Sequence, residues 1–356
     1  MQSGLQEFFS NNDVFLYVSF KKGSVMTKKQ CIHTILFLLL LFVLFRLVTY
    51  VLRDKSGAEY IYNFKDEPEN SIDVILLGSS HMYRTIQPME LWNDYGIASY
   101  NLGSSEQSLP LSYYLLKEAV RKQNPSYVVL DVYMLIMPLK DYTHERVHQV
   151  VDNMEWSVNK INAITDIIPP DKWIYYFLNI GQYHSRWSEV TKKDFQKING
   201  ITKGSDFTQG HTKLKEPVWE KDEKAEIPKM PFSYLNKIVR LCKENNMKLI
   251  FTLMPYAIDT YEEHIGIFNS FEEIAFENEW DYFNMIALSK ETGLDWSKDF
   301  AETQHVNHNG SRKVTNYLGK LLRNCYQITD HRGENKYHSW NLNFDAYLDY
   351  RKKILT

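Results

Sequence analysis

The segment Leu77-Gly78-Ser79-Ser80-His81-Met82-Tyr83 closes a short apolar run that begins at Ile72. A short apolar run that ends in glycine is typical of a buried strand. The turn behind such a strand exposes a side chain where a nucleophile is useful. We therefore predict a strand over residues 73–77 and a nucleophilic serine behind it. Ser79 competes with Ser80 for this role, and capping of the next helix is an alternative role for Ser80.

A second segment far downstream supplies the groups that a serine nucleophile needs. In Asp299-Phe300-Ala301-Glu302-Thr303-Gln304-His305-Val306-Asn307 an acid stands three residues before a histidine. A serine hydroxyl becomes a nucleophile when a base takes its proton, and a carboxylate orients that base. We predict His305 as the base and Glu302 as the orienting acid, with Asp299 as the alternative acid.

These two blocks, together with three further stretches, carry a family resemblance. The further stretches are Tyr100-Asn101-Leu102-Gly103, Tyr183-His184-Ser185-Arg186-Trp187 and Asp330-His331-Arg332. Over about residues 70 to 345 the chain resembles the SGNH (GDSL-type) hydrolase superfamily. Within it, the chain is similar to membrane-anchored SGNH-like proteins of Gram-positive bacteria, which resemble extracytoplasmic acyl-transfer proteins of cell-envelope polymers. The resemblance implies Ser80 as nucleophile, although Ser79 stands where the GDS pattern has Asp.

The resemblance also implies donors for the oxyanion that forms during acyl transfer. The superfamily takes them from the nucleophile's own amide, here Ser80, from a glycine that Gly103 matches, and from an asparagine in a third block. No Gly-x-Asn-Asp follows the run that ends at Val132, so Tyr133 is a candidate for the third donor. Candidate substrate-binding residues are His81, Asn101, His184, Arg186 and Asn307. For His184 and Arg186, which could recognise a phosphate or carboxylate, a structural ion-pair cluster is an equal alternative.

Alternating apolar and amphipathic runs predict an α/β domain with a mainly parallel sheet. The expected strands are residues 73–77, 98–101, 127–132, 248–253 and 282–284. The expected helices are residues 109–123, 232–245, 261–277 and 310–325. Five strands with intervening helices suit the three-layer, flavodoxin-like SGNH fold, in which the site lies at the carboxyl ends of the strands. The domain is expected over residues 71–345, followed by a C-terminal tail at 346–356.

Residues from about 138 to 228 interrupt this alternation and are expected to form an insertion that is rich in Trp, Tyr, His and Lys. Its aromatic residues are Trp156, Trp173, Tyr175, Tyr176 and Trp187. They could stack on sugar rings or form the core of the insertion itself.

The N-terminal region contains an apolar run over residues 32–52, about the length that crosses a bilayer. Several lysines precede this run, whereas few basic residues follow it closely. By the positive-inside rule, residues 1–31 are therefore expected in the cytoplasm and the rest outside. A cleaved signal peptide is the alternative. Residues 53–70 read as a linker, and Met26 is a second candidate start of translation.

Composition excludes other classes of function. The net charge of -3 leaves no basic footprint for nucleic acid, and three cysteines argue against a disulfide framework or a zinc ribbon. One rival motif remains, because His144-Glu145-Arg146-Val147-His148 matches the H-E-x-x-H pattern of zinc peptidases. No third histidine follows at a recognised spacing, and a solvated helix turn is the alternative to a metal site.

Together these observations predict a single-pass membrane protein with an outward-facing SGNH-like domain that needs no cofactor. It would act as a serine esterase or O-acyltransferase on acyl groups of a cell-envelope polysaccharide, through an acyl-Ser80 intermediate. A multi-span membrane acyltransferase is a possible partner. The alternatives are a catalytically silent accessory or glycan-binding protein and, third, the zinc peptidase.

Overall fold

The computed structural model describes residues 27–53, 59–137, 143–195, 200–220, 222–257 and 262–355. The candidate start Met26, nearly all of the expected cytoplasmic segment, part of the linker and the expected start of the insertion at Pro138 lie outside these ranges. The chain divides into two units, residues 1–50 and 51–356, and each is described by itself.

The first unit consists of helix α1, Lys28–Leu52, whose last two residues belong to the second unit. Its 25 residues are long and apolar enough to cross a membrane, since about 20 apolar residues are needed. Leucine and phenylalanine side chains along it are exposed. The helix begins four residues before the apolar run predicted from the sequence.

The second unit is built on a five-stranded parallel sheet in the order β2-β1-β3-β4-β5. The strands are β1 Val74–Leu77, β2 Ser99–Asn101, β3 Tyr127–Asp131, β4 Lys248–Leu253 and β5 Asp281–Asn284. This is the flavodoxin-like order, in which β2 is added on one side of β1 and the later strands are added on the other side. The predicted fold class is confirmed, and all five expected strands are present within one residue of their expected bounds.

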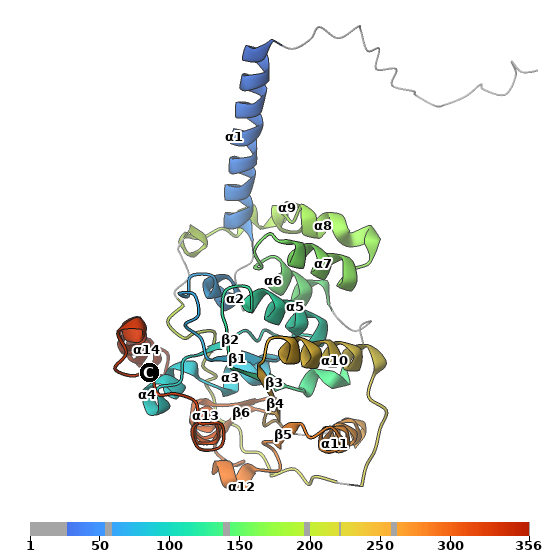
Figure 1. The fold of residues 1–356 in the computed structure, drawn as a ribbon, viewed down its shortest axis with the longest axis vertical. Helices are drawn as coiled ribbons and strands as arrows, with labels where there is room; N and C mark the ends of the chain where they lie inside the picture. Colours follow the sequence, from blue (N-terminus) through green and yellow to red (C-terminus); the bar gives the residue numbers. More distant parts are fainter. Residues whose placement is uncertain are drawn as a thin grey trace, which may run out of the picture. The chain divides into compact units, whose positions relative to one another are not determined.

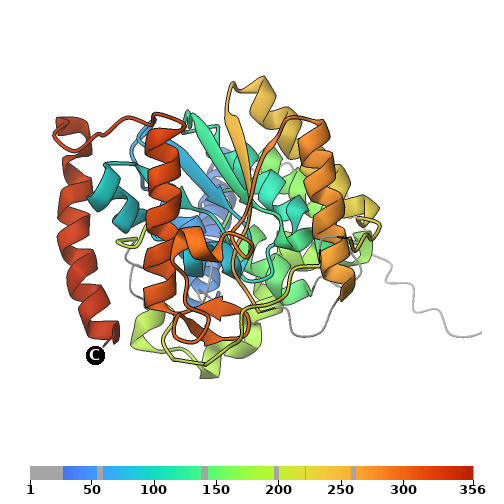
Figure 2. The ribbon, with the colours of Figure 1, turned by 90° about the horizontal axis from the view of Figure 1, so that it is seen from below.

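Helices cover both faces of the sheet (Figures 1 and 2). α5 and α10 lie on one side, α3, α4 and α13 lie on the other, and α11 packs beside β5. Their bounds are α3 Ser80–Thr85, α4 Pro88–Tyr95, α5 Leu109–Ala119, α10 Lys229–Glu244, α11 Glu262–Glu277, α12 Ser289–Thr292 and α13 His308–Asn324. Side chains fix several helix starts: Ser108 Oγ accepts from Leu111 N, and Asn307 Oδ1 caps α13.

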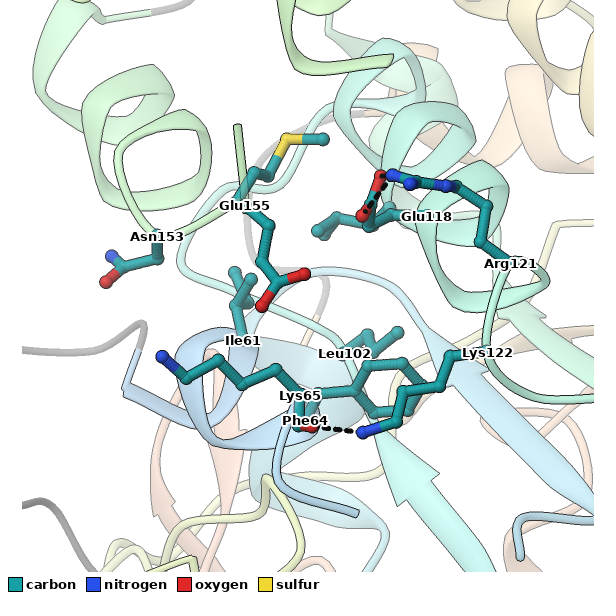
Figure 3. A pocket seen from close by; sticks show the side chains of 11 residues that line it. Ile61, Phe64, Lys65, Leu102, Glu118, Arg121, Lys122, Asn153 and Glu155 are labelled. Carbon is teal, nitrogen blue, oxygen red and sulfur yellow. Dashed lines mark hydrogen bonds and ion pairs between the residues drawn. The ribbon is translucent and has the colours of Figure 1, made fainter. Parts of the chain in front are cut away.

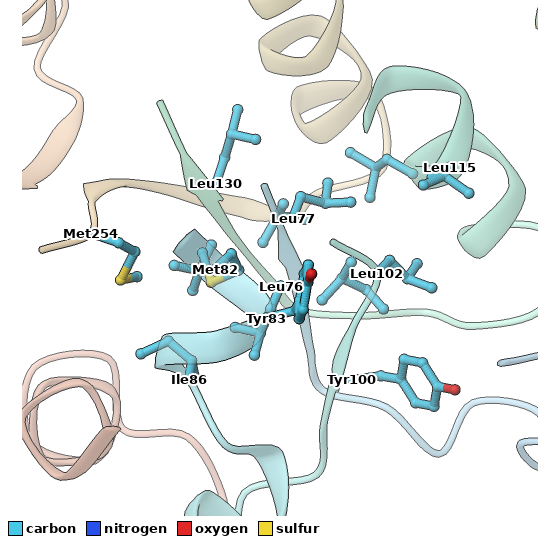
Figure 4. Packing of buried hydrophobic residues seen from close by; sticks show 14 of the residues in the cluster. Leu76, Leu77, Met82, Tyr83, Ile86, Tyr100, Leu102, Leu115, Leu130 and Met254 are labelled. Carbon is cyan, nitrogen blue, oxygen red and sulfur yellow. The ribbon is translucent and has the colours of Figure 1, made fainter. Parts of the chain in front are cut away.

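Buried hydrophobic side chains pack where β1 meets the helix that follows it (Figure 4). All four residues of β1 are fully buried, because helices cover both faces of the sheet. Met82 and Ile86 from α3 and its C-terminal cap pack in this cluster, and Leu130 and Met254 join them from the neighbouring strands. The start of α3 is therefore held rigidly at the end of β1.

The insertion consists of two different parts. The first contains helices α6 His144–Val151, α7 Val158–Ile167, α8 Trp173–Phe177 and α9 Ile180–Tyr183, with short 3-10 turns at Pro170–Lys172, His184–Ser188 and Lys192–Phe195. The second part, residues 200–220 and 222–228, has no helix or strand. It passes along the catalytic segments, since Asp206 N donates to Tyr83 O and His308 N to Thr208 O. This second part therefore runs beside the segments predicted to be catalytic.

The ends of the domain differ from expectation. Residues 346–355, expected as a tail, are the second half of α14, His338–Leu355. Its Tyr347 is fully buried, and Arg351 pairs with Glu90 of α4. The expected linker likewise contains α2, Glu59–Phe64, and Glu67, which forms a buried ion pair with Lys203. Both segments are thus parts of the folded domain.

Candidate active site

Ser80 is the first residue of α3, at the carboxyl end of β1. Ser79 is the N-cap of this helix, and its Oγ accepts from the His81 amide at 3.3 Å. The two serines therefore have separate roles: Ser79 caps, and the Ser80 hydroxyl is free of capping. Gly78 permits this turn, because a Cβ there would lie 2.7 Å from Asp131 Cβ and 2.9 Å from Met82 Cβ.

His305 comes to Ser80 on a small antiparallel hairpin, β6 Phe300–Glu302 and β7 His305–Val306. β7 packs against α3. The hairpin is followed directly by α13, whose cap is Asn307. Asn307 Nδ2 donates to Lys298 O at 2.8 Å and to Gly210 O at 3.3 Å. The segment that carries the histidine is thus fixed at both ends.

The three predicted catalytic side chains meet in one hydrogen-bonded row. His305 Nε2 lies 2.8 Å from Ser80 Oγ, and His305 Nδ1 is hydrogen-bonded to Glu302 Oε1. The other Glu302 oxygen accepts from the Gln304 amide at 2.6 Å, which fixes the carboxylate. With the Nδ1 proton donated to Glu302, Nε2 is the nitrogen that accepts the serine proton. This is the arrangement of a serine nucleophile, its base and an orienting acid.

Asp299, the alternative acid, does not orient His305. Its buried Oδ2 accepts from the Asp295 amide at 2.7 Å and from Lys313 Nζ at 2.6 Å. The carboxylate thus joins the loop before β6 to α13. Glutamate reaches the imidazole from the hairpin, in which the register shifts between Phe300 and Glu302.

Arg84 is a site residue that the sequence analysis missed. Its Nη1 lies 3.3 Å from His305 Nδ1, on the same side of the ring as Glu302. Burial lowers the pKa of His305 and the Arg84 charge lowers it further, whereas Glu302 opposes both effects. The base is therefore held neutral. The available signal was its position four residues after Ser80, one helical turn further along the same face.

An aromatic cluster packs against the base. The ring of buried His81 lies 4.0 Å from that of Tyr133, 5.1 Å from that of Tyr256 and 5.4 Å from that of His305. Burial and the neighbouring His305 lower the pKa of His81 to about 3, so its ring is neutral. Tyr256 was not predicted, although it lies in the loop at the carboxyl end of β4, where site residues are expected.

Asp131 lies beneath this cluster, at the end of β3. Its Oδ1 accepts from the Met254 amide at 3.1 Å. Burial raises its pKa to about 7, against the lowering effect of bonds from the Met254 and Tyr133 amides. Asp131 thus links the loops after β3 and β4, the loops that carry Tyr133 and Tyr256.

The predicted oxyanion donors lie near the nucleophile, but one of them is already hydrogen-bonded within the protein. A Cβ on Gly103 would lie 3.2 Å from Ser79 O and 2.9 Å from Gly78 O, so its loop packs directly on the nucleophile turn. However, the Gly103 amide donates to Asn101 Oδ1 at 3.0 Å. The roles of the Ser80 amide, Gly103 and Tyr133 as oxyanion donors stay predictions.

Three of the candidate substrate-binding residues, Asn101, Asn307 and Arg186, make structural contacts, and substrate binding by any of the five stays a prediction. Asn101 is fully buried, with Oδ1 on Gly103 and Nδ2 on Met82 O, and Asn307 caps α13. His184 and Arg186 directly follow α9, which lies at the opposite end of the domain from β6 (Figure 1). Arg186 pairs with Glu189 and Asp194, which is the structural ion-pair cluster weighed as the alternative. Of the five candidates, only His81 lies beside the catalytic row.

The H-E-x-x-H segment is helical, as α6, but it is not arranged as a zinc site. His148 is buried, its Nδ1 is 3.0 Å from Asp152 Oδ2, and its ring stacks on Tyr176 at 3.9 Å. His144 Nδ1 instead faces the Tyr176 hydroxyl at 3.2 Å. Within the described ranges, no group of three metal-ligating side chains is present. The motif forms a packed histidine–tyrosine–aspartate core of the insertion.

A cavity of about 250 Å³ lies between α2, α5 and residues 153–155 (Figure 3). Some of the charged side chains that line it contact one another or the backbone. Arg121 forms an ion pair with Glu118, and Lys122 donates a hydrogen bond to the Lys65 carbonyl. It contains none of the catalytic side chains. The cavity is therefore separate from the site at Ser80.

Comparison with known proteins gives similarity to solved structures only. No family model matches the chain, and no curated protein matches it. Three similar structures are a protein described as a lipolytic protein of the G-D-S-L family from Desulfitobacterium hafniense DCB-2, an acetyl xylan esterase, and a protein described as an acylhydrolase from Bacteroides fragilis NCTC 9343. They are 12%, 13% and 11% identical, each with a TM-score of 0.37. They cover 70%, 70% and 77% of this chain and 98%, 100% and 99% of their own.

The chain has the fold expected from its resemblance to SGNH hydrolases. The strand order of its own sheet is the basis for this statement. The similarities to solved structures, at this level of identity, say nothing of substrate or reaction. The domain presents Ser80 and His305 together, and the chemistry that follows rests on that geometry.

Proposed function

We propose that this protein is a membrane-anchored serine esterase or O-acyltransferase that acts on acyl groups of a cell-envelope polysaccharide. The observation that carries the proposal is the row Ser80–His305–Glu302, in which a hydroxyl, a neutral imidazole and a carboxylate are in hydrogen-bonding order. The polysaccharide substrate, the outward-facing topology and a possible multi-span acyltransferase partner are supported by the sequence resemblance and by α1 alone.

The first half-reaction forms an acyl-serine. His305 Nε2 takes the Ser80 proton while Oγ attacks the ester carbonyl, and the negative charge moves to the carbonyl oxygen. The tetrahedral intermediate collapses, the C–O bond to the donor alcohol breaks, and His305 returns the proton to that alcohol. Glu302 stabilises the imidazolium in between. The product is an ester between the acyl group and Ser80.

The second half-reaction decides between the two activities. Water or a sugar hydroxyl gives its proton to His305 while its oxygen bonds to the acyl carbon. The bond between the acyl carbon and Ser80 Oγ then breaks, His305 returns the proton to Oγ, and the acid or the new ester leaves. Attack by water is hydrolysis, and attack by a sugar hydroxyl is transfer. The two activities share every group described above, so they differ only in which acceptor reaches the acyl-serine.

One observation favours a second candidate, a catalytically silent accessory protein. The Gly103 amide, which would stabilise the oxyanion, donates to Asn101 Oδ1. A missing oxyanion donor costs about 10²–10³ in kcat. A protein with this arrangement could bind acylated glycan without turning it over.

The test is covalent labelling of the full chain in detergent by a fluorophosphonate, together with hydrolysis of p-nitrophenyl acetate. The proposal expects both in the native protein and neither in Ser80→Ala, while Ser79→Ala keeps labelling because Ser79 only caps α3. Acyl transfer is then measured as mass added to an oligosaccharide acceptor. Labelling that survives Ser80→Ala would refute the nucleophile, and no labelling of a folded native protein would favour the accessory role.

A further inference from the structure

An exposed apolar surface lies on the outer layer of the insertion. Its large side chains are Ile174, Tyr175, Leu178, Trp187 and Phe195, all within residues 174–195. Single exposed apolar residues are ordinary, but five in one short segment exceed that. Trp187 is 74% exposed, and Ile174 and Leu178 are 54% and 50% exposed. A concentration of this kind marks an interaction surface.

The same segment is bonded to the residues where α1 ends. Arg186 Nη1 donates to the carbonyl of Leu52, the last residue of α1, at 2.7 Å. The next residue, Arg53, donates to Asp152 O at 3.0 Å, and Asp152 in turn accepts from the Tyr183 hydroxyl at 2.7 Å. Arg186 therefore lies within hydrogen-bonding distance of the point where the apolar span stops.

We propose that this surface, residues 174–195, lies in the headgroup layer of the membrane that α1 crosses. The inference rests on the membrane anchor of the proposed function. The end of a membrane span lies at the boundary of the hydrocarbon, and the polar layer beyond it is on the order of 5–10 Å deep. A segment bonded to Leu52 is therefore at that depth, and Trp and Tyr are the residues that favour this layer.

The charge of the segment argues for an apolar contact rather than an electrostatic one. Residues 174–195 contain Arg186, Lys192 and Lys193 against Glu189 and Asp194, an excess of one positive charge. With an excess of only one positive charge, attraction to anionic lipid is weak. Insertion of the apolar side chains would therefore vary little with salt.

The contact would fix which way the catalytic row faces. α8 and α9 form the outermost layer at one end of the domain, whereas β6 and α13 lie toward the other end (Figure 1). With residues 174–195 in the headgroups, the segment that carries Glu302 is turned away from the lipid. The site would then be open to polymer chains beyond the membrane surface and not to acyl groups held within the bilayer.

The test places an environment-sensitive nitrobenzoxadiazole probe on single cysteines of the full chain in phosphatidylcholine–phosphatidylglycerol vesicles. Cys31 and Cys325, both exposed, are first replaced by Ser, and Cys242 is buried. The probe positions are Leu178→Cys and Trp187→Cys. The matched control is Phe276→Cys on α11, an apolar residue that is 86% exposed and outside the proposed surface.

The inference predicts blue-shifted emission and quenching by doxyl-labelled lipid at positions 178 and 187, and neither at 276. Absence of quenching at 178 and 187, equal quenching at 276, or efficient cross-linking of two copies through position 187 would overturn it. Alkaline carbonate extraction of the same vesicles distinguishes failure of this inference from failure of the membrane anchor. Protein that stays in the membrane without quenching refutes this inference alone, whereas extracted protein refutes the anchor and this inference with it.

Discussion

The Arg84 guanidinium lies 3.3 Å from His305 Nδ1, the nitrogen that also faces the Glu302 carboxylate. A cation and an anion thus act on one nitrogen of the base. Arg84 and burial lower the pKa of His305, and Glu302 raises it. The base is consequently available at a lower pH than an isolated imidazole would be.

Replacing Arg84 should move the pH dependence of the reaction. Arg84→Gln removes the charge that lowers the His305 pKa, so that pKa rises. Because the neutral imidazole is the active form, the acid limb of kcat/KM shifts to higher pH. The measurement is a pH profile of p-nitrophenyl acetate hydrolysis. Arg121→Gln, at an exposed position just after the end of α5, is the control and should leave the acid limb in place. An acid limb that does not move in Arg84→Gln would contradict the assignment.

Glu302 should be needed for catalysis and Asp299 for stability. Glu302→Gln removes the charge that stabilises the imidazolium, and we expect a loss of about 10²–10⁴ in kcat. Asp299→Asn weakens the bond to Lys313 and should lower Tm while kcat falls little. Kinetics and thermal melts of both variants check this. A large loss of kcat in Asp299→Asn with a small loss in Glu302→Gln would instead indicate Asp299 as the acid that orients His305.

Asp131 should make the folded domain less stable as pH rises. Its pKa is raised to about 7 by burial, above the usual value near 4, so the folded state holds a proton that the unfolded state has lost. This contribution is fully present below about pH 4 and is lost as pH rises through about 7. Between these values the group lowers the free energy of unfolding by about 1.4 kcal/mol per pH unit.

Asp131→Asn should therefore flatten the pH dependence, since the amide resembles the protonated carboxyl and still accepts from the Met254 amide. Urea unfolding of both proteins at pH 5 and pH 8 measures the difference. A variant whose stability falls as steeply as that of the native protein would show that Asp131 is ionised throughout.

Gly78→Ala should be destabilising without touching any catalytic side chain. The added Cβ would lie 2.7 Å from Asp131 Cβ, so β3 or α3 must shift. Overpacking of this kind costs about 1–3 kcal/mol. The control is Gly181→Ala in α9, where the nearest atom, on Tyr175, is 3.6 Å away. Equal unfolding free energies for the two variants would show that the Gly78 turn can relax.

Metal removal should leave esterase activity unchanged, because His148 is held by Asp152 and Tyr176 instead of a cation. His148→Ala removes a buried, hydrogen-bonded ring, and we expect it to cost about 2–4 kcal/mol of stability. Its activity at low temperature should persist. Activity that is lost to a chelator and restored by zinc would revive the peptidase reading of residues 144–148.

The elements predicted correctly are those whose pattern is local. Each strand of the sheet is a short apolar run between polar turns, and α5, α10, α11 and α13 repeat apolar residues at helical spacing. α14 was missed because its apolar stripe is weak, and its Trp340 and Tyr347 are buried by tertiary contacts with the rest of the domain. The second part of the insertion has no periodicity, so its path beside α3 could not be read from the chain.

The sequence by itself indicated the fold class and, as candidate catalytic residues, a strand-turn serine, His305 and one of two nearby acids, because these are patterns of neighbouring residues. Only the tertiary structure decided how those residues divide their work. In the folded domain Glu302, and not Asp299, is hydrogen-bonded to His305, and Arg84 lies beside the same nitrogen. Ser79 caps α3, which leaves the Ser80 hydroxyl free of capping. The physical reason is that hydrogen bonds and charges act over a few ångströms in space, and Ser80 and His305, 225 positions apart in the chain, are brought within that range only by folding.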